Sequence, residues 1–294
     1  MTTRRVVGIA AAAVLMFVGG CTNDESALDT KPITVPVSVQ PDIAALVPSS
    51  IRDGGVLIVG TNVPYQPNEF KNRNGEIIGY DIDVTRALAQ VLGLRVRFVE
   101  SEFAKIIPAI QAGTFHMGIS AFTDTVERQK QVDFVDYFTA GIRWARRTGT
   151  DITPETACGH RVSVKAATVQ FTEEVPAKSA ACVKRGEKPI RMVKFENQDA
   201  TVNAVLLGQA DALSADSPVT EYAVKKTDGQ LETVGPTFDS APYGMPVAKG
   251  SALGPALRDA LQYLIDHGYY GRISHHWGVA AGMIHTSVIN GAKE

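Results

Sequence analysis

The sequence lacks the motifs that mark several large classes of protein. It contains no Gly-x-Ser-x-Gly segment, no glycine-rich phosphate loop and no His-Glu-x-x-His pair, which are signatures of hydrolases, nucleotide-binding proteins and zinc proteases. The formal net charge is only −2, and the longest basic cluster, residues 143–147, is interrupted by Trp144 and Ala145. A nucleic-acid-binding protein needs a clustered basic face that releases counterions from phosphates. We therefore expect no nucleic-acid partner, and we expect no cofactor.

Long apolar runs are also scarce, and the one at the N-terminus is typical of an export signal. Arg4 and Arg5 precede an apolar run over residues 6–18, and Gly19-Gly20-Cys21 follow. A basic start, a short apolar stretch and small residues at the cut are features of secretory signals. The cut resembles the lipobox of bacterial lipoproteins, which implies that residues 1–20 are removed and that Cys21 is lipidated. We expect acyl chains to hold the body to the outer face of the cytoplasmic membrane. A plain signal with an incidental cysteine is the alternative, and the export route, Sec or twin-arginine, stays open.

Cysteine is rare, with three residues in 294. Once Cys21 is assigned to lipidation, Cys158 and Cys182 remain. Outside the cytoplasm two leftover thiols favour a disulfide, which would stabilise the fold by about 3–4 kcal/mol in the chain-entropy model. Two separately buried thiols are the alternative. We expect no metal site, because no His or Cys stands at ligand spacing nearby.

Residues 21–50 show no sustained hydrophobic period and carry prolines at positions 32, 36, 41 and 48. This composition predicts a flexible tether, with residues 43–47 docking as a short turn and globular structure beginning near Gly54. Beyond it, apolar strands and amphipathic helices alternate twice along the chain. Such alternation predicts parallel strands with crossover helices, hence an α/β fold, and a body of this length suits two lobes better than one.

Ordered motifs over nearly the whole body resemble extracellular solute-binding proteins of family 3, the polar amino-acid-binding proteins of ABC importers. The motifs are Gly55-Val-Leu-Ile-Val-Gly-Thr61, Tyr65-Gln-Pro-Asn-Glu-Phe70, Ile78-Gly-Tyr-Asp-Ile-Asp-Val84, Thr123-Asp-Thr-Val-Glu-Arg128 and Asp211-Ala-Leu-Ser-Ala-Asp216. The resemblance implies a two-lobed periplasmic-binding-protein type II (Venus flytrap) fold that closes on its ligand. It also implies an ABC permease and its ATPase as partners, a membrane contact through the lipid anchor alone, and a monomer.

The resemblance also implies domain boundaries. Lobe 1 is expected at residues 51–142 plus 244–294, and lobe 2 at 147–238. Two hinge strands are expected at residues 143–146 and 239–243.

On lobe 1 the resemblance implies that Arg128 binds the ligand carboxylate, since a guanidinium offers two parallel donors to one carboxylate. The hydroxyl and N–H of Thr123 point to the same region, next to Ser120, and the carbonyl of Ala121 would face the ammonium. A surface arginine is the alternative for Arg128. Thr125 is expected to cap the helix that begins after it.

On lobe 2 the resemblance implies that Asp216 binds the ligand ammonium, because a carboxylate at the carboxyl end of a parallel strand lies at the ligand crevice. Helix capping is the alternative. Thr168 is expected to donate to the ligand carboxylate from a helix start. Ala167 and Val169 replace glycines that are common in this loop of relatives, so its backbone is less free.

The walls and the specificity of the site rest on four further residues. Tyr65 and Phe103 match positions that sandwich the ligand side chain, with core burial as the alternative. Asn62 stands where relatives often have an acid, and Lys165 adds a positive donor from lobe 2 or forms a salt bridge across the lobe. Together these residues favour glutamine, glutamate, asparagine or aspartate over arginine or lysine.

Two other functions remain open. The same fold resembles certain periplasmic cyclohexadienyl dehydratases, which place a carboxylic acid against the ligand, and Glu69 and Glu196 are the candidates for that acid. The second of these functions is that of a sensor, a binding protein that presents its ligand to a receptor. We expect a binding protein rather than an enzyme.

Overall fold

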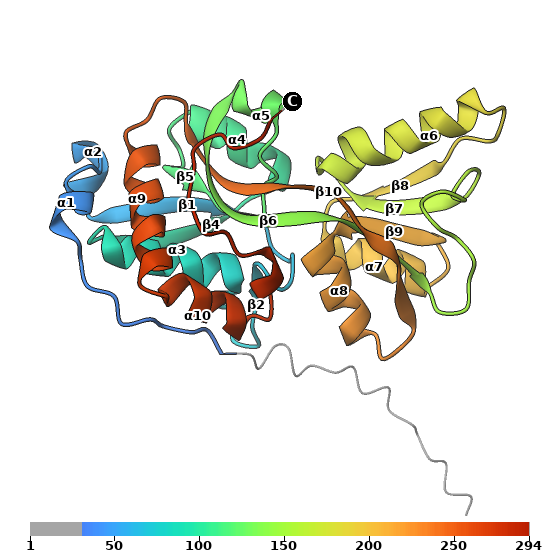
Figure 1. Ribbon diagram of the computed structural model, residues 1–294, viewed down its shortest axis with the longest axis horizontal. Coiled ribbons are helices and arrows are strands. Elements are labelled where there is room, and N and C mark those ends of the chain that lie inside the picture. The colour runs from blue at the N-terminus through green and yellow to red at the C-terminus, as the bar shows by residue number, and fades with distance from the viewer. Residues whose placement is uncertain (1–30, 294) are drawn as a thin grey trace, which may run out of the picture.

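The computed structural model describes residues 31–293, so the export signal and Cys21 lie outside the described residues. One sheet of eight strands runs through both lobes in the order β4-β1-β5-β10-β6-β9-β7-β8. Two long antiparallel strands, β6 (Val132–Arg147) and β10 (Leu231–Ala248), cross from one lobe to the other (Figure 1). The α/β fold with two lobes joined by two strands, predicted from the sequence, is confirmed.

Lobe 1 surrounds the parallel strands β4, β1 and β5. Its elements in chain order are β1 (Val56–Thr61), β2 (Phe70–Lys71), β3 (Ile77–Ile78), α3 (Tyr80–Val91), β4 (Arg95–Glu100), α4 (Phe103–Gln111), β5 (Met117–Gly118), α5 (Val126–Gln129), α9 (Leu253–Asp266), α10 (Tyr269–His276) and the short 3-10 turn η3 (Ala280–Gly282). Helices lie on both faces of the sheet (Figure 1), as crossover connections between parallel strands require.

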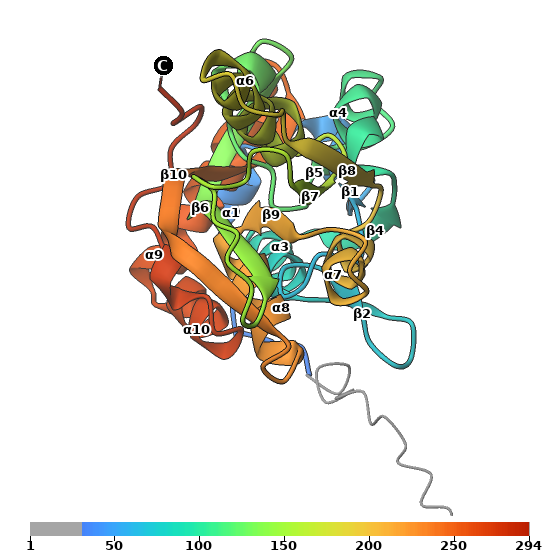
Figure 2. The ribbon, with the colours of Figure 1, turned by 90° about the vertical axis from the view of Figure 1, so that its right-hand side faces the viewer.

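Lobe 2 repeats this arrangement with β8, β7 and β9 as its parallel strands. Its elements are β7 (Arg161–Lys165), η2 (Gln170–Glu174), α6 (Val175–Lys184), β8 (Arg191–Phe195), α7 (Gln198–Leu206), β9 (Ala212–Asp216) and α8 (Ser217–Lys226). Seen from the end of lobe 2, α6 lies on one side of these strands and α7 and α8 lie on the other (Figure 2).

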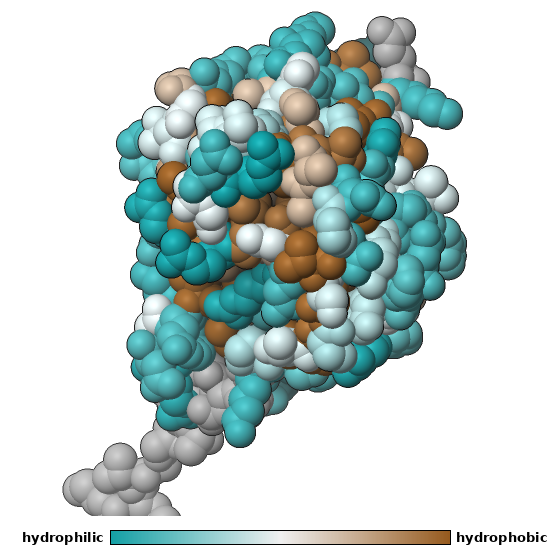
Figure 3. All heavy atoms as spheres, turned by 90° about the vertical axis from the view of Figure 1, so that its left-hand side faces the viewer, coloured by the Kyte–Doolittle hydropathy of each residue, from teal (hydrophilic) through white to brown (hydrophobic). Residues whose placement is uncertain are grey.

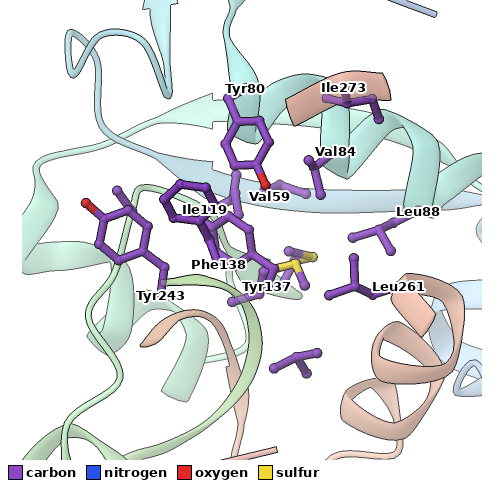
Figure 4. Packing of buried hydrophobic residues seen from close by; sticks show 14 of the residues in the cluster. Val59, Tyr80, Val84, Leu88, Ile119, Tyr137, Phe138, Tyr243, Leu261 and Ile273 are labelled. Carbon is purple, nitrogen blue, oxygen red and sulfur yellow. The ribbon is translucent and has the colours of Figure 1, made fainter. Parts of the chain in front are cut away.

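The core of lobe 1 is rich in aromatic rings. Tyr80 packs against Tyr137 and Phe138 with ring centroids 6.2 and 5.3 Å apart, and Tyr243 lies 5.6 Å from Phe138 (Figure 4). Phe138 and Tyr243 belong to β6 and β10, so the same rings that fill the core also hold the two crossing strands in place.

The core of lobe 2 is smaller and carries a covalent link. Trp144 is its largest fully buried side chain and donates to Glu174 at 3.1 Å. A disulfide joins Cys158 to Cys182, with their Cα atoms 5.6 Å apart, and so connects the loop before β7 to α6.

The expectation of a flexible tether is wrong for residues 31–42 and 48–50, whereas the expected docking of residues 43–47 is confirmed. Val35 and Val47 are buried in the core of lobe 1, and the N–H of Ile33 donates to Asp83 at 2.9 Å. The chain there is extended and then forms α1 (Pro41–Ala44) and α2 (Ser49–Arg52). Ile33, Val35 and Val37 alternate along the extended part, so one face packs on the lobe. Because the segment is rich in proline, its apolar residues at every second position were not recognised in the sequence as a packed strand-like segment.

These N-terminal turns, α1 and α2, belong to the end of lobe 1 that faces the viewer in Figure 3, where apolar side chains gather toward the middle of a largely hydrophilic face. Within residues 31–293 no helix is both long and apolar enough to cross a bilayer.

Candidate ligand-binding site

A small cavity lies between the lobes, where strands from both of them end. Nine of the ten binding residues expected from the sequence line it: Tyr65, Phe103, Ser120, Ala121, Thr123, Arg128, Lys165, Thr168 and Asp216. The carboxyl ends of β1 and β5 in lobe 1 and of β7 and β9 in lobe 2 meet here, which is the usual place for ligands in open α/β sheets.

Arg128 bridges the two lobes from α5. Its Nη1 donates to the carbonyl of Thr123 at 2.8 Å, and its Nη2 donates to the carbonyl of Ala167 in lobe 2 at 2.9 Å. The hydroxyl of Thr125 accepts the Arg128 N–H and caps the helix as expected. Burial lowers the pKa of Arg128 from its ordinary value. The alternative of a surface arginine is therefore wrong.

Asp216 ends β9 and faces the cavity. One carboxylate oxygen accepts from the hydroxyl of Tyr65 at 2.7 Å, and the other accepts from Nε2 of Gln170 at 2.8 Å. Its side chain makes no capping hydrogen bond to α8, so the capping alternative does not hold. The Tyr65 contact joins lobe 1 to lobe 2, like that of Arg128.

Lys165 ends β7 and reaches across the cleft. Its side chain is buried, and the ammonium lies 4.3 Å from the ring centroid of Tyr65 and 4.9 Å from that of Phe103. Burial lowers the pKa of Lys165 to about 8, although the negative charges of Glu69 and Asp216 act in the opposite direction. The ammonium is held against two aromatic faces, an arrangement that favours a cation.

Glu69 is fully buried beside the cavity. Its Oε1 accepts from the hydroxyl of Ser120 at 2.6 Å, whereas its Oε2 has no hydrogen-bond partner among the described residues. Burial, followed by the nearby charge of Asp81, raises the pKa of Glu69 well above its usual range. Burial also raises the pKa of Asp81 to about 6. A buried acid pair of this kind tends to keep a proton.

Asn62 is the expected residue that does not line the cavity. Its amide nitrogen donates to the carbonyl of Ser101 at 2.7 Å, so the side chain is turned toward the start of α4. Thr168 lines the cavity, but its hydroxyl donates to the carbonyl of Lys165 at 2.8 Å. Its loop passes through Ala167 at φ 61°, a left-handed conformation that glycine adopts more easily.

Two lining residues, Val169 and Gln170, were not among the predicted binding residues. Gln170 follows Thr168 by two positions and begins η2, so its place at the start of the helical segment after β7 was the available signal. Glu196, one of the two candidate acids, has a side chain that is 70% exposed and pairs with Lys194 at 3.1 Å. It is not among the residues that line the cavity.

Sequence and fold comparisons agree with this arrangement. Residues 57–280 match the family model of bacterial extracellular solute-binding proteins, family 3. The chain belongs to this family. It is 43% identical to the arginine-binding protein ArgT of Corynebacterium glutamicum over 85% of this chain and 83% of the relative. It is 29% identical to the ABC transporter glutamine-binding protein GlnH of Bacillus subtilis over 78% of this chain and 83% of the relative.

Solved structures of the same architecture include an ancestral arginine-binding protein, determined with arginine and with glutamine. Each has a TM-score of 0.70 and 33% identity, and covers 76% of this chain and 98% of the other. The ancestral amino acid-binding protein AncCDT-1, a precursor of cyclohexadienyl dehydratase, has a TM-score of 0.69 and 32% identity over 79% of this chain and 99% of its own. The family-3 chain described here is thus an amino-acid-binding protein of the ABC transporter type.

Proposed function

We propose that this family-3 protein is the lipid-anchored binding component of an ABC importer. It captures a polar amino acid between its lobes and delivers it to a membrane permease. The observation that carries the proposal is the pairing of a partly buried cation, Arg128 of lobe 1, with a buried anion, Asp216 of lobe 2, both lining one cavity. A zwitterion needs both groups at once.

Binding exchanges the protein's own contacts for contacts to the ligand. The ligand carboxylate takes the guanidinium donors of Arg128, which now point at the carbonyls of Thr123 and Ala167. The ligand ammonium donates to Asp216, where Tyr65 and Gln170 now donate. Because each group bridges or faces both lobes, a ligand held between them favours the closed arrangement over the open one.

The side chain of the ligand faces Lys165 and the rings of Tyr65 and Phe103. Lys165 donates hydrogen bonds and accepts none, so it suits a side-chain oxygen. We therefore favour glutamine and glutamate, followed by asparagine and aspartate, as ligands.

Arginine is the second candidate, and a specific observation favours it. Glu69 is a buried acid that contacts the cavity-lining Ser120, and its carboxylate form would pair with a guanidinium. ArgT, with 43% identity, is an arginine-binding protein. Arginine would require the Lys165 ammonium to leave the aromatic rings, since both cations would need the same space.

Calorimetric titration of the purified protein with glutamine, glutamate, asparagine, aspartate, arginine and lysine tests this function. We expect glutamine or glutamate to bind most tightly. Binding of arginine alone would replace our ligand assignment with the second candidate. If none of these bound and a cyclohexadienyl acid were converted to product, the enzyme interpretation would take its place.

A measurement of amino-acid uptake by whole cells distinguishes transport from sensing. A strain deleted for this gene should lose accumulation of the labelled ligand and regain it with the intact gene. A strain that keeps uptake but loses a transcriptional response to the amino acid would favour the sensor.

A further inference from the structure

Glu174 is a buried acid of lobe 2 that does not line the cavity. It is the last residue of η2 and follows Gln170 by four positions. Gln170 lines the cavity and donates to Asp216 at 2.8 Å, whereas only 4% of the Glu174 side chain is exposed. Residues four positions apart lie on the same side of a helical segment. One side of η2 therefore carries a cavity residue at its start and a buried carboxylate at its end.

Both carboxylate oxygens of Glu174 accept hydrogen bonds, from donors on two different strands. Its Oε1 accepts from the indole nitrogen of Trp144 at 3.1 Å, and its Oε2 accepts from the hydroxyl of Ser214 at 2.9 Å. Trp144 belongs to β6, which crosses between the lobes, and Ser214 stands on β9 two residues before Asp216. Glu174 thus joins η2 to a crossing strand and to the strand that carries Asp216.

Glu174 is also connected to the other crossing strand. The Lys178 ammonium lies 3.9 Å from Glu174 Oε1 and 4.7 Å from the ring centroid of Phe238 on β10. Both strands that cross between the lobes therefore contact η2 through this carboxylate, β6 directly and β10 through Lys178. A movement of the lobes about these strands would act on η2 through the same contacts.

Stability alone does not explain a carboxylate at this place. The lobe 2 core that Glu174 joins through Trp144 is apolar, and burying a charged group costs free energy even when it is hydrogen-bonded. An apolar side chain would fill the same space at a lower cost. The carboxylate adds two acceptors with fixed directions, which hold η2 in one orientation on β6 and β9.

We infer that Glu174 is a positioning residue of the binding site: by fixing η2 against β6 and β9 it holds the η2 wall of the cavity and the Asp216 carboxylate in the relative position that receives the amino acid. Glu174 itself does not touch the ligand and acts through Trp144 and Ser214. The inference rests on the proposed function, because amino-acid affinity is its main readout.

Replacement of Glu174 by glutamine tests the inference. Glutamine keeps the size of the side chain but puts an NH₂ group where one acceptor oxygen stood, so either Trp144 or Ser214 loses its acceptor. We expect Glu174→Gln to bind L-glutamine and L-arginine at least about fivefold more weakly than the wild type, by the same factor for both, since both share the ammonium that Asp216 binds. Glu187→Gln, on an exposed side chain of lobe 2 that pairs with Arg185, is the matched control and should bind as the wild type does.

A double-mutant cycle identifies the route of the effect. Ser214→Ala removes one of the two donors without touching Glu174. In the double variant Glu174→Gln with Ser214→Ala, the loss of affinity should be smaller than the sum of the two single losses, because both changes break the same contact. Ser214→Ala alone also tests the inference if Glu174→Gln does not fold, and it should weaken L-glutamine binding at least about threefold.

The pH dependence of binding is a second readout. The ionised carboxylate of Glu174 accepts with both oxygens, whereas the protonated form loses one acceptor. Burial raises the pKa of Glu174 to about 7, while the Lys178 ammonium of α6 acts in the opposite direction and the Asp239 carboxylate of β10 acts in the same direction. Wild-type affinity for L-glutamine should therefore rise from pH 6 to pH 8 relative to that of Glu174→Gln. Lys165 and Glu69 are unchanged in this variant, so the difference between the two profiles isolates Glu174.

Trp144 supplies a spectroscopic signature of the same contact. The chain has two tryptophans, so in a Trp277→Phe background the emission comes from Trp144 alone. Its emission should change between pH 6 and pH 8, because the indole N–H donates to the titrating carboxylate. The change should disappear when Glu174→Gln is added. A purely structural role would lower the melting temperature of Glu174→Gln without any pH-dependent difference in affinity.

The outcomes separate this inference from the proposed function. If the wild type binds L-glutamine or L-arginine and Glu174→Gln keeps that affinity within about twofold from pH 6 to pH 8, the inference is wrong and the function stands. Additive losses in the double variant also overturn the inference, because Glu174 would then not act through Ser214. If the wild type melts cooperatively but binds no amino acid, the proposed function fails, and the inference fails with it.

Discussion

The two lobes meet at one cavity but are built and charged differently. Lobe 1 packs stacked aromatic rings against the crossing strands and contributes Tyr65, Phe103 and Arg128 to the cavity. Lobe 2 has a smaller core closed by a disulfide and contributes Lys165 and Asp216. In the proposed function each lobe binds one charge of a zwitterion, Arg128 from lobe 1 and Asp216 from lobe 2, so we expect neither lobe alone to hold the ligand. The comparison teaches that lobe 1 contributes the aromatic walls and the cation, whereas lobe 2 contributes the anion and a second cation, Lys165.

The largest expected effect comes from removing the cation of lobe 1. Arg128→Ala should weaken amino-acid binding by about 2–5 kcal/mol, because truncation of one partner leaves the ligand carboxylate buried without its donor. Calorimetry measures the loss. Lys130→Ala, two residues away on an exposed side chain that pairs with Glu127, is the control. Equal affinities of the two variants would remove Arg128 from the site.

The next effect concerns the stability of lobe 2. Replacing both Cys158 and Cys182 by serine should lower the free energy of unfolding by about 3–4 kcal/mol in the chain-entropy model, since the bridge closes a separation of 24 residues. Chemical denaturation followed by tryptophan fluorescence reports this, because Trp144 lies in the lobe 2 core and Trp277 lies in lobe 1. We expect the midpoint of the unfolding transition reported by Trp144 to move to a lower denaturant concentration. A reductant should shift the wild type in the same direction and leave the double variant unchanged.

The third effect concerns the stability of lobe 1, which should depend on pH through Asp136. Burial and the neighbouring carboxylate of Asp124 raise the pKa of Asp136 from 3.8 to about 8. The folded protein therefore binds this proton more tightly than the unfolded chain does. The stability that the group contributes is fully present below pH 3.8 and is lost as the pH rises through about 8.

Asp136→Asn should flatten this dependence. Asparagine stays neutral and still offers a donor toward Asp124, so the variant should melt at a higher temperature than wild type at pH 9 and at a similar one below pH 3.8, where Asp136 is protonated in both the folded and the unfolded state. Thermal melts across this pH range measure the slope. A variant with the same slope as wild type would show that another group carries it.

The smallest effect is expected at Glu196. Its side chain is 70% exposed and forms an ion pair with Lys194, and exposed pairs contribute about 0–1 kcal/mol. Glu196→Gln should therefore leave both ligand affinity and melting temperature close to wild type. A loss of ligand binding in this variant would restore Glu196 as a candidate for the acid that contacts the ligand.

Local sequence patterns predicted those parts of the fold that local interactions determine. The alternation of apolar strands and amphipathic helices and the capping role of Thr125 agree with the structure. Each depends on neighbours within a few residues, such as a run of apolar side chains or a hydroxyl three residues before the N–H it accepts.

The rest could not be predicted because it depends on contacts between distant segments. Residues 31–50 have a composition typical of a tether, yet three alternating apolar residues find a partner surface on α3 and its neighbours. Asn62 turns to the carbonyl of Ser101, 39 positions along the chain. The contact of Lys165 with two rings of the other lobe exists only once the lobes meet. The sequence therefore predicted a positive donor at Lys165 but not the aromatic rings that its ammonium contacts.

A crystal structure of the protein with its tightest-binding amino acid would test the central claim most directly. The account predicts the ligand carboxylate within about 3 Å of the Arg128 guanidinium and the ligand ammonium within about 3 Å of the Asp216 carboxylate. Tyr65 and Phe103 should flank the side chain. A ligand bound elsewhere, or bound in this cavity with its carboxylate away from Arg128, would contradict it.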